Sequence, residues 1–170
     1  MAYNYDKLYG ETRNALGQPT SVLVDFFDQL DQHNVRVLDV GCGQGRDAVF
    51  IASLGHRVVG VDISPNGIGD LRDAAIKKNL AVVGVVADIT TYKPEGLFDI
   101  VLIDRTLHML DRPSRVTVLN SLMDHVNDDG WLLIADESSN ISDFKAVALA
   151  HELDWKTRFT ERGYLFLRRS

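Results

Sequence analysis

Apolar residues recur along this chain with two spacings, and the two spacings alternate. Four residues, Leu23, Phe26, Phe27 and Leu30, fall at i, i+3, i+4 and i+7, which places them on one face of a helix that begins near Pro19. Compact apolar runs without this spacing, such as residues 35–40, are typical of buried strands. The pattern predicts strands at residues 35–40, 57–62, 81–89, 98–104 and 131–136, and helices at residues 46–54, 66–78, 113–126 and 142–153.

The end of the chain predicts a hairpin. Residues 154–160 and 164–168 have strand character and are joined by a tight turn, so they can only be antiparallel. A further turn is predicted at residues 128–130. Alternating strands and helices followed by a hairpin give the α/β class. We expect a Rossmann-like doubly wound sheet of seven strands with the last strand antiparallel and helices on both faces.

The composition and charge of the chain argue against nucleic-acid-binding and membrane-anchored proteins. The 170 residues are enough for one domain spanning residues 1–170. A net charge of -6 without clustered lysine and arginine argues against nucleic acid. No run approaches about 18 apolar residues and the N-terminus lacks a signal-sequence core, so we expect no membrane anchor and a cytoplasmic protein. The single cysteine, Cys42, lies between two glycines, where a small structural side chain is favoured over a nucleophile.

A glycine-rich loop joins the strand at residues 35–40 to the following helix. Gly41 can adopt backbone angles closed to other residues, and Gly43 and Gly45 leave no Cβ between the main chain and a ligand. A dinucleotide fingerprint would place its third glycine at Arg46, one residue later than it occurs. Asp39, two residues before Gly41, would repel a pyrophosphate and attract an ammonium or sulfonium. The loop therefore predicts a site for a cationic cofactor.

A second carboxylate ends the next strand. Asp62 lies 21 residues beyond Gly41, where the acid of a βαβ unit accepts both hydrogen bonds of a ribose diol. Its alternative role, a cap for the following helix, is already filled by Ser64 before Pro65. Asp62 is accordingly predicted to bind ribose.

The sequence Asp39-x-Gly41-x-Gly43-x-Gly45 closely resembles motif I of the class I S-adenosylmethionine-dependent methyltransferases. The resemblance implies S-adenosylmethionine as cofactor, with Asp39 drawing its ammonium and the backbone at Gly41 and Gly43 lining its methionyl part. It further implies that Asp88 contacts the adenine amine and that Ile89 packs on the ring. The cofactor residues expected on this basis are Asp39, Gly41, Cys42, Gly43, Gly45, Asp62, Ile63, Asp88, Ile89 and Asp104.

Residues after the strand at 98–104 are predicted to serve the methyl acceptor. Ligands of open α/β sheets bind beyond the carboxyl ends of the strands, so Asp104, Arg105 and His108 should face the methyl group or its acceptor. His108 is the first candidate for a proton acceptor and Asp104 the second, as needed for a neutral hydroxyl or amine. A packing role is the alternative for His108.

Within this superfamily, Gly41-Cys42-Gly43-Gln44-Gly45-Arg46 and the opening Tyr5-Asp6-Lys7-Leu8-Tyr9 look most like the tellurite-resistance and thiopurine-type methyltransferases. That resemblance implies a small-molecule acceptor, a chalcogen oxyanion or a thiol, and it makes residues 1–18 either a flap over the cofactor or a tail. The cations Arg46, Arg105, Arg112 and His108 would form a mouth for an anion, unless the arginines pair with Asp47 or Asp111.

Three other functions are weighed against this one. Asp104, Asp136 and Glu137 resemble the divalent-metal site of catechol-type O-methyltransferases. A cofactor-binding subunit without catalysis would keep the same motifs. A nicotinamide dehydrogenase is disfavoured by the position of Gly45.

Overall fold

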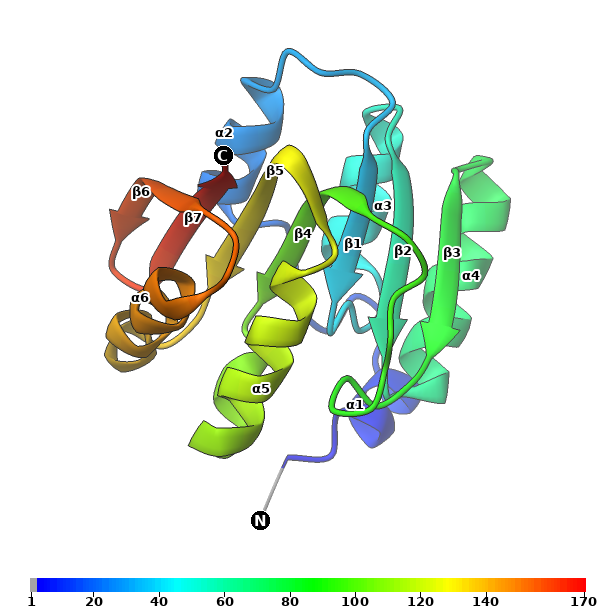
Figure 1. Cartoon of the computed structure of the whole chain (residues 1–170). Coiled ribbons are helices and arrows are strands. Elements are labelled where there is room, and N and C mark those ends of the chain that lie inside the picture. Colours follow the sequence, from blue (N-terminus) through cyan, green and yellow to red (C-terminus); the bar gives the residue numbers. More distant parts are fainter. Residues whose placement is uncertain (1–2) are drawn as a thin grey trace. The chain divides into compact units, whose positions relative to one another are not determined.

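The structure, a computed structural model, describes residues 3–170 and consists of two compact units, Met1–Asp88 and Ile89–Ser170 (Figure 1). Each unit carries its own run of strands and helices. No helix within residues 3–170 is both long and apolar enough to cross a membrane.

The first unit contains three parallel strands in the order β3-β2-β1. The strands are β1 Arg36–Val40, β2 Arg57–Asp62 and β3 Val82–Val86, and the helices are α1 Tyr5–Glu11, α2 Ser21–Asp28, α3 Arg46–Ser53 and α4 Pro65–Lys78. In register, Val40 pairs with Val61, and Asp62 pairs with Val86. The carboxyl ends of the three strands therefore meet at one edge of this unit, where the glycine loop begins.

The predicted start of α4 is confirmed. The Ser64 hydroxyl accepts the Gly67 N–H at 2.9 Å, and Pro65 occupies the first turn, where its missing N–H costs nothing. The helix ends at Asn79, which adopts the left-handed conformation with φ +51°. Because Ser64 caps the helix, the Asp62 side chain remains available for another role.

The prediction of a buried strand at residues 81–89 is wrong in its burial. β3 is parallel to β2 as expected, but it is an edge strand, and Val83 and Val86 are 60% and 44% exposed. α4 packs on β3, and a Cβ at Gly84 would lie 3.1 Å from Ile68 of that helix. A valine-rich run indicates a strand without showing how many neighbours cover it.

The second unit contains four strands in the order β4-β5-β7-β6. Its elements are β4 Phe98–Asp104, η1 Leu107–Met109, α5 Arg112–Met123, β5 Val126–Ala135, η2 Ser138–Asn140, α6 Ile141–Ala150, β6 Trp155–Glu161 and β7 Tyr164–Arg169. β4 and β5 are parallel, whereas β7 is antiparallel to both β5 and β6 (Figure 1). The predicted hairpin, the α/β class and the seven strands with a reversed last strand are confirmed.

Several element boundaries differ from those predicted, and two of the differences lie around the start of β5. Residues 128–130 form an irregularity inside β5, because pairing with β4 steps from Phe98–Val126 directly to Ile100–Trp131. The helix predicted at residues 113–126 ends at Met123, since Val126 already belongs to β5. The Asp-Asp-Gly sequence at residues 128–130 is typical of a turn. The same residues are compatible with a turn before a strand and with a bulge inside a strand.

Candidate functional site

The glycine loop is folded onto the carboxyl end of β2. The N–H groups of Gly41 and Cys42 both donate to the Val61 carbonyl, at 2.8 and 3.1 Å, and the Gly45 N–H donates to the Cys42 carbonyl at 2.8 Å. Gly41, Gly43 and Gly45 have φ values of +75°, +53° and +87°, which non-glycine residues rarely adopt.

Close packing also requires glycine in this loop. A Cβ at Gly43 would lie 2.6 Å from the hydroxyl of Tyr9, and a Cβ at Gly45 would collide with the Leu71 side chain. Gly43 is therefore covered by α1, and Gly45 is where α4 approaches the loop.

Asp62 is held rigidly at the end of β2. Its Oδ2 accepts the Gly43 N–H at 2.9 Å and its Oδ1 accepts the Ser64 N–H at 2.8 Å. Each carboxylate oxygen keeps a second lone pair, so a diol can donate to both oxygens at once. The geometry fits the predicted ribose contact.

Buried negative charge surrounds the loop. Asp39 is 2% exposed in β1, and Cys42 is 5% exposed. Burial, together with the charges of Asp39 and Asp62, raises the pKa of the Cys42 thiol well above its usual value. The thiol stays protonated, as the structural interpretation of Cys42 requires.

The N-terminal segment is docked on this loop by α1. Burial and the Asp62 charge raise the pKa of Tyr9, so its hydroxyl stays neutral against Gly43. The Gln44 amide nitrogen donates to the carbonyl of Thr12 at 2.8 Å and to Asp70 at 2.7 Å, and its oxygen accepts the Ala15 N–H at 2.9 Å. Sequence reasoning missed these contacts of Gln44.

Asp6 fastens α1 to the start of α4. One carboxylate oxygen accepts the Ser64 hydroxyl at 2.5 Å and the Asn66 N–H at 3.1 Å, and these hydrogen bonds lower the pKa of Asp6 below 3.8. A lowered pKa in the folded protein means that the contact stabilises the docked helix above about pH 3.8. The stabilisation is lost as pH falls through the lowered pKa.

Asp6→Ala is accordingly expected to release α1 at neutral pH. Hydrogen exchange of the α1 amides should become about tenfold faster, because the carboxylate that accepts from the Ser64 hydroxyl and the Asn66 N–H is lost. In the native sequence the same acceleration, corrected for intrinsic rates, should appear only below pH 4. Lys7→Ala is the matched control, since the Lys7–Glu11 pair is solvent-exposed at 3.9 Å and stabilises little. Equal exchange in the two variants would contradict this role of Asp6.

Asp88 and Ile63 lie at the same edge of the first unit. The Ala87 N–H donates to the Asp62 carbonyl at 2.9 Å, and exposed Asp88 follows directly. Ile63, next to Asp62, is 67% exposed, a large apolar side chain available to a flat ring. Ile89 is the first residue of the second unit, and its packing on the adenine ring stays a prediction.

Asp104 and Arg105 lie at the carboxyl end of β4. The Asp104 side chain is 3% exposed, and Arg105 Nε lies 3.8 Å from Asp104 Oδ1 while the arginine side chain is 69% exposed. Arg105 has φ +52°, unusual for a residue with a Cβ, and its N–H donates to the Ala135 carbonyl at 2.7 Å. The arginine thus turns the chain out of the sheet and presents its charge to solvent.

His108 contacts Asp136. The His108 N–H donates to Asp136 Oδ2 at 3.1 Å, and ring Nδ1 lies 3.6 Å from the same oxygen. Asp136 Oδ1 accepts the Glu137 N–H and the Asn140 amide, each at 2.8 Å. Sequence reasoning considered Asp136 only as a metal ligand and missed Asn140. One signal in the sequence could have indicated the contact between His108 and Asp136. The predicted strands β4 and β5 are parallel and consecutive in the chain, so the residues that follow their carboxyl ends lie at the same edge of the sheet.

The donor set expected for a divalent metal does not assemble. Within residues 3–170 no three histidine, cysteine, aspartate or glutamate side chains are grouped as metal ligands. The Asp136 oxygens already accept three N–H groups. The part of the chain that the structure describes therefore does not bring Asp104, Asp136 and Glu137 together as a set of three ligands.

Two of the expected cations are paired. Arg46 binds Asp47 through two contacts of 2.7 and 3.2 Å, as the alternative interpretation held. Arg112 pairs with Asp143 at 2.7 Å rather than with Asp111. Asp111 instead accepts the Ser114 N–H at 2.8 Å and caps α5.

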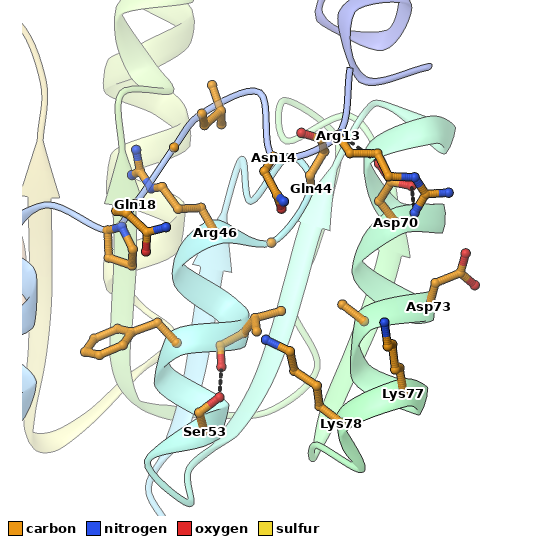
Figure 2. Close-up of a pocket in the computed structure, with 17 residues that line it drawn as sticks. Arg13, Asn14, Gln18, Gln44, Arg46, Ser53, Asp70, Asp73, Lys77 and Lys78 are labelled. Atoms are coloured by element: carbon orange, nitrogen blue, oxygen red, sulfur yellow. Dashed lines mark hydrogen bonds and ion pairs between the residues drawn. The ribbon is translucent and has the colours of Figure 1, made fainter. Parts of the chain in front are cut away.

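A groove of about 650 Å³ lies beside α3 and α4 in the first unit (Figure 2). Figure 2 shows Gln44 pointing toward Asp70, and Arg13 lies 3.7 Å from the same carboxylate. The residues that line the groove are Arg13, Asn14, Leu16, Gly17, Gln18, Pro19, Gln44, Gly45, Arg46, Val49, Phe50, Ser53, Asp70, Asp73, Ala74, Lys77 and Lys78. The groove shares Gln44 and Gly45 with the glycine loop, but of the predicted cofactor residues Gly45 alone lines it.

The chain is similar to known methyltransferases in sequence and in fold. A family model described as a methyltransferase domain matches residues 37–130, from β1 into β5. The chain belongs to this family. The predicted resemblance to the class I S-adenosylmethionine-dependent methyltransferases is confirmed.

Curated relatives of this methyltransferase domain are longer proteins. The chain is 29% identical over 99 residues to the probable S-adenosyl-L-methionine-dependent methyltransferase TehB of Haemophilus influenzae (strain 10810). The matched region covers 58% of this chain and 35% of the relative. The chain is 32% identical over 137 residues to a phosphoethanolamine N-methyltransferase of Triticum aestivum, covering 78% and 26%. The chain thus spans about a third or less of the length of these relatives.

Solved structures show the same fold. A TehB-like SAM-dependent methyltransferase from Corynebacterium glutamicum superimposes with a TM-score of 0.74 at 23% identity, over 97% of this chain and 95% of that one. Magnesium protoporphyrin IX methyltransferase from Synechocystis PCC 6803, solved with bound SAM, gives 0.67 at 17% identity, over 98% and 78%. The predicted Rossmann-like architecture of the methyltransferase domain is confirmed.

Proposed function

We propose that residues 1–170 form one methyltransferase domain that uses S-adenosylmethionine to methylate a small-molecule acceptor. The observation that carries this proposal is the fixed Asp62 carboxylate, which both the glycine loop and Ser64 hold at the end of β2. Family membership supports the same reaction class.

In this proposal the first unit binds the cofactor. Asp62 accepts the ribose hydroxyls, and buried Asp39 attracts the methionine ammonium near the loop. Asp88 accepts a hydrogen bond from the exocyclic amine of adenine, and Ile63 and Ile89 pack against the adenine ring. When bound, the cofactor supplies a methyl group already activated on a sulfonium. The protein then has to orient the acceptor and exclude water.

The acceptor is proposed to be a chalcogen oxyanion or a thiol, the class implied by the resemblance to the tellurite-resistance methyltransferases. Similarity to TehB supports methyl transfer from S-adenosylmethionine. Arg105 is the exposed cation at the end of β4 and would attract an anionic acceptor. Incubation with labelled S-adenosylmethionine and a panel of selenite, thiols, catechols and amines tests the assignment. Cofactor binding without transfer to any acceptor would favour the non-catalytic subunit.

If the acceptor is an oxyanion, Arg105→Ala should raise KM for selenite about tenfold, or about 1.4 kcal/mol, and leave kcat nearly unchanged. An exposed charge acts on encounter and ground-state binding, and its effect should shrink with added salt. Arg158→Ala on β6 is the control, because Arg158 is also exposed but lies away from the end of β4. Unchanged kinetics in Arg105→Ala would remove the oxyanion from consideration.

A further inference from the structure

Asp136 is a buried carboxylate whose orientation is fixed from three directions. Its side chain is 0% exposed. The Glu137 N–H and the Asn140 amide hold Oδ1 at 2.8 Å each, and the His108 N–H holds Oδ2 at 3.1 Å. These three N–H donors fix the orientation of the carboxylate, so its Oδ2 lies 3.6 Å from Nδ1 of the His108 ring.

The His108 ring lies beside this carboxylate, and its Nδ1 makes no hydrogen bond within residues 3–170 of the structure. Nδ1 is buried and lies 3.6 Å from Asp136 Oδ2, while the side chain as a whole is 26% exposed. A bare nitrogen lone pair facing a carboxylate oxygen would be repelled, whereas an N–H facing it is attracted. The arrangement therefore favours the proton on Nδ1 and leaves the Nε2 lone pair on the accessible side of the ring.

The other histidines of the second unit are placed differently. His125 Nδ1 lies 2.9 Å from the carbonyl of Gly96, so this ring contacts the main chain. His151 is 2% exposed, and its Nε2 lies 3.3 Å from an exposed carboxylate, Asp124. Among these three rings, His108 alone combines a buried carboxylate partner with an accessible edge.

We propose that Asp136 is a positioning residue that holds His108 as a proton acceptor, and that the methyl acceptor therefore carries a neutral thiol or hydroxyl. This inference rests on the proposed methyl transfer. As the acceptor atom bonds to the methyl carbon, the electron pair of the broken S–C bond stays on sulfur, and the acceptor proton passes to Nε2. Asp136 stabilises the imidazolium until the proton leaves to water.

The tautomer can be measured without any acceptor. Nitrogen-15 NMR at alkaline pH, where imidazoles are neutral, should show the His108 proton on Nδ1 in the native protein, with His108→Gln identifying the signal. In Asp136→Asn the proton should shift toward Nε2, with the His125 and His151 signals unchanged. A native ring protonated on Nε2 would overturn the proposal.

Kinetics of His108→Gln test the proton transfer and remain informative if Asp136→Asn fails to fold. With a thiol or a catechol as probe, kcat should fall about 100-fold or more, while KM and the Kd for S-adenosylhomocysteine stay unchanged. His125→Gln should match the native protein. Unchanged kcat in His108→Gln, or native methylation of selenite but of no thiol or catechol, would overturn the inference. Failure of the native protein to bind S-adenosylhomocysteine would instead overturn the proposed function.

Discussion

Asp62→Ala is expected to weaken the binding of S-adenosylhomocysteine about 100-fold or more. The substitution removes the acceptor of two ribose hydroxyls, and each hydrogen bond to a charged group contributes about 1.5–3 kcal/mol. It also frees the N–H groups of Gly43 and Ser64, which Asp62 holds at 2.9 and 2.8 Å. Isothermal titration calorimetry measures the change directly.

Two comparisons separate ribose recognition from damage to the loop. Asp73→Ala removes an exposed carboxylate from α4 and should leave the Kd unchanged. A 2′-deoxy analogue of S-adenosylhomocysteine should bind the native protein about tenfold more weakly, yet should bind Asp62→Ala as well as the parent ligand does. If the analogue loses as much affinity in the variant as in the native protein, Asp62 does not contact the ribose.

Gly45→Ala is expected to destabilise the protein by roughly 2–4 kcal/mol. Part of the cost is the left-handed backbone at φ +87°, which disfavours any residue with a Cβ. The larger part arises because the new methyl would collide with Leu71, and overpacking a core commonly costs 1–3 kcal/mol. Urea unfolding followed by circular dichroism gives the free energy of unfolding.

Gly55→Ala provides the matched control. Gly55 has φ +91°, but nothing lies within 4 Å of the position its Cβ would take, so only the backbone cost of about 1 kcal/mol should appear. Leu71→Ala is itself destabilising because Leu71 is fully buried, but in that background Gly45→Ala should cost less than in the native protein, since the obstructing side chain is gone. Equal destabilisation by the two glycine substitutions would show that α4 does not approach the loop at Gly45.

Local signals in the sequence predicted much of the fold, and the proposed cofactor cradle rests on signals of the same kind. The strand at residues 57–62 and the Ser64 cap agree with the structure, because both depend on neighbouring residues alone. The Asp62 site follows from the same local logic, since a βαβ unit fixes where its second strand ends. The exposure of Val83 and Val86 could not be read in this way, because the number of neighbours around β3 is a property of the whole sheet.

The missed contacts of the site join residues distant in sequence. His108 and Asp136 are 28 positions apart, and the Gln44 side chain reaches the Thr12 carbonyl across 32. Nothing in the pattern of a single element distinguishes such pairs from solvated side chains. Arg112 shows the same effect: the adjacent Asp111 was the expected partner, but α5 packs on α6 and brings Asp143 to the guanidinium instead.

The cradle at the end of β1 and β2 is expected to accept a cationic adenosyl sulfonium and to disfavour a diphosphate. Calorimetric titration of the native chain with S-adenosylmethionine and, separately, with NAD tests it most directly. We expect saturable one-to-one binding of S-adenosylmethionine, at least about 100-fold tighter than any binding of NAD, a difference of about 2.7 kcal/mol. No heat with S-adenosylmethionine, or equal affinity for NAD, would contradict the account.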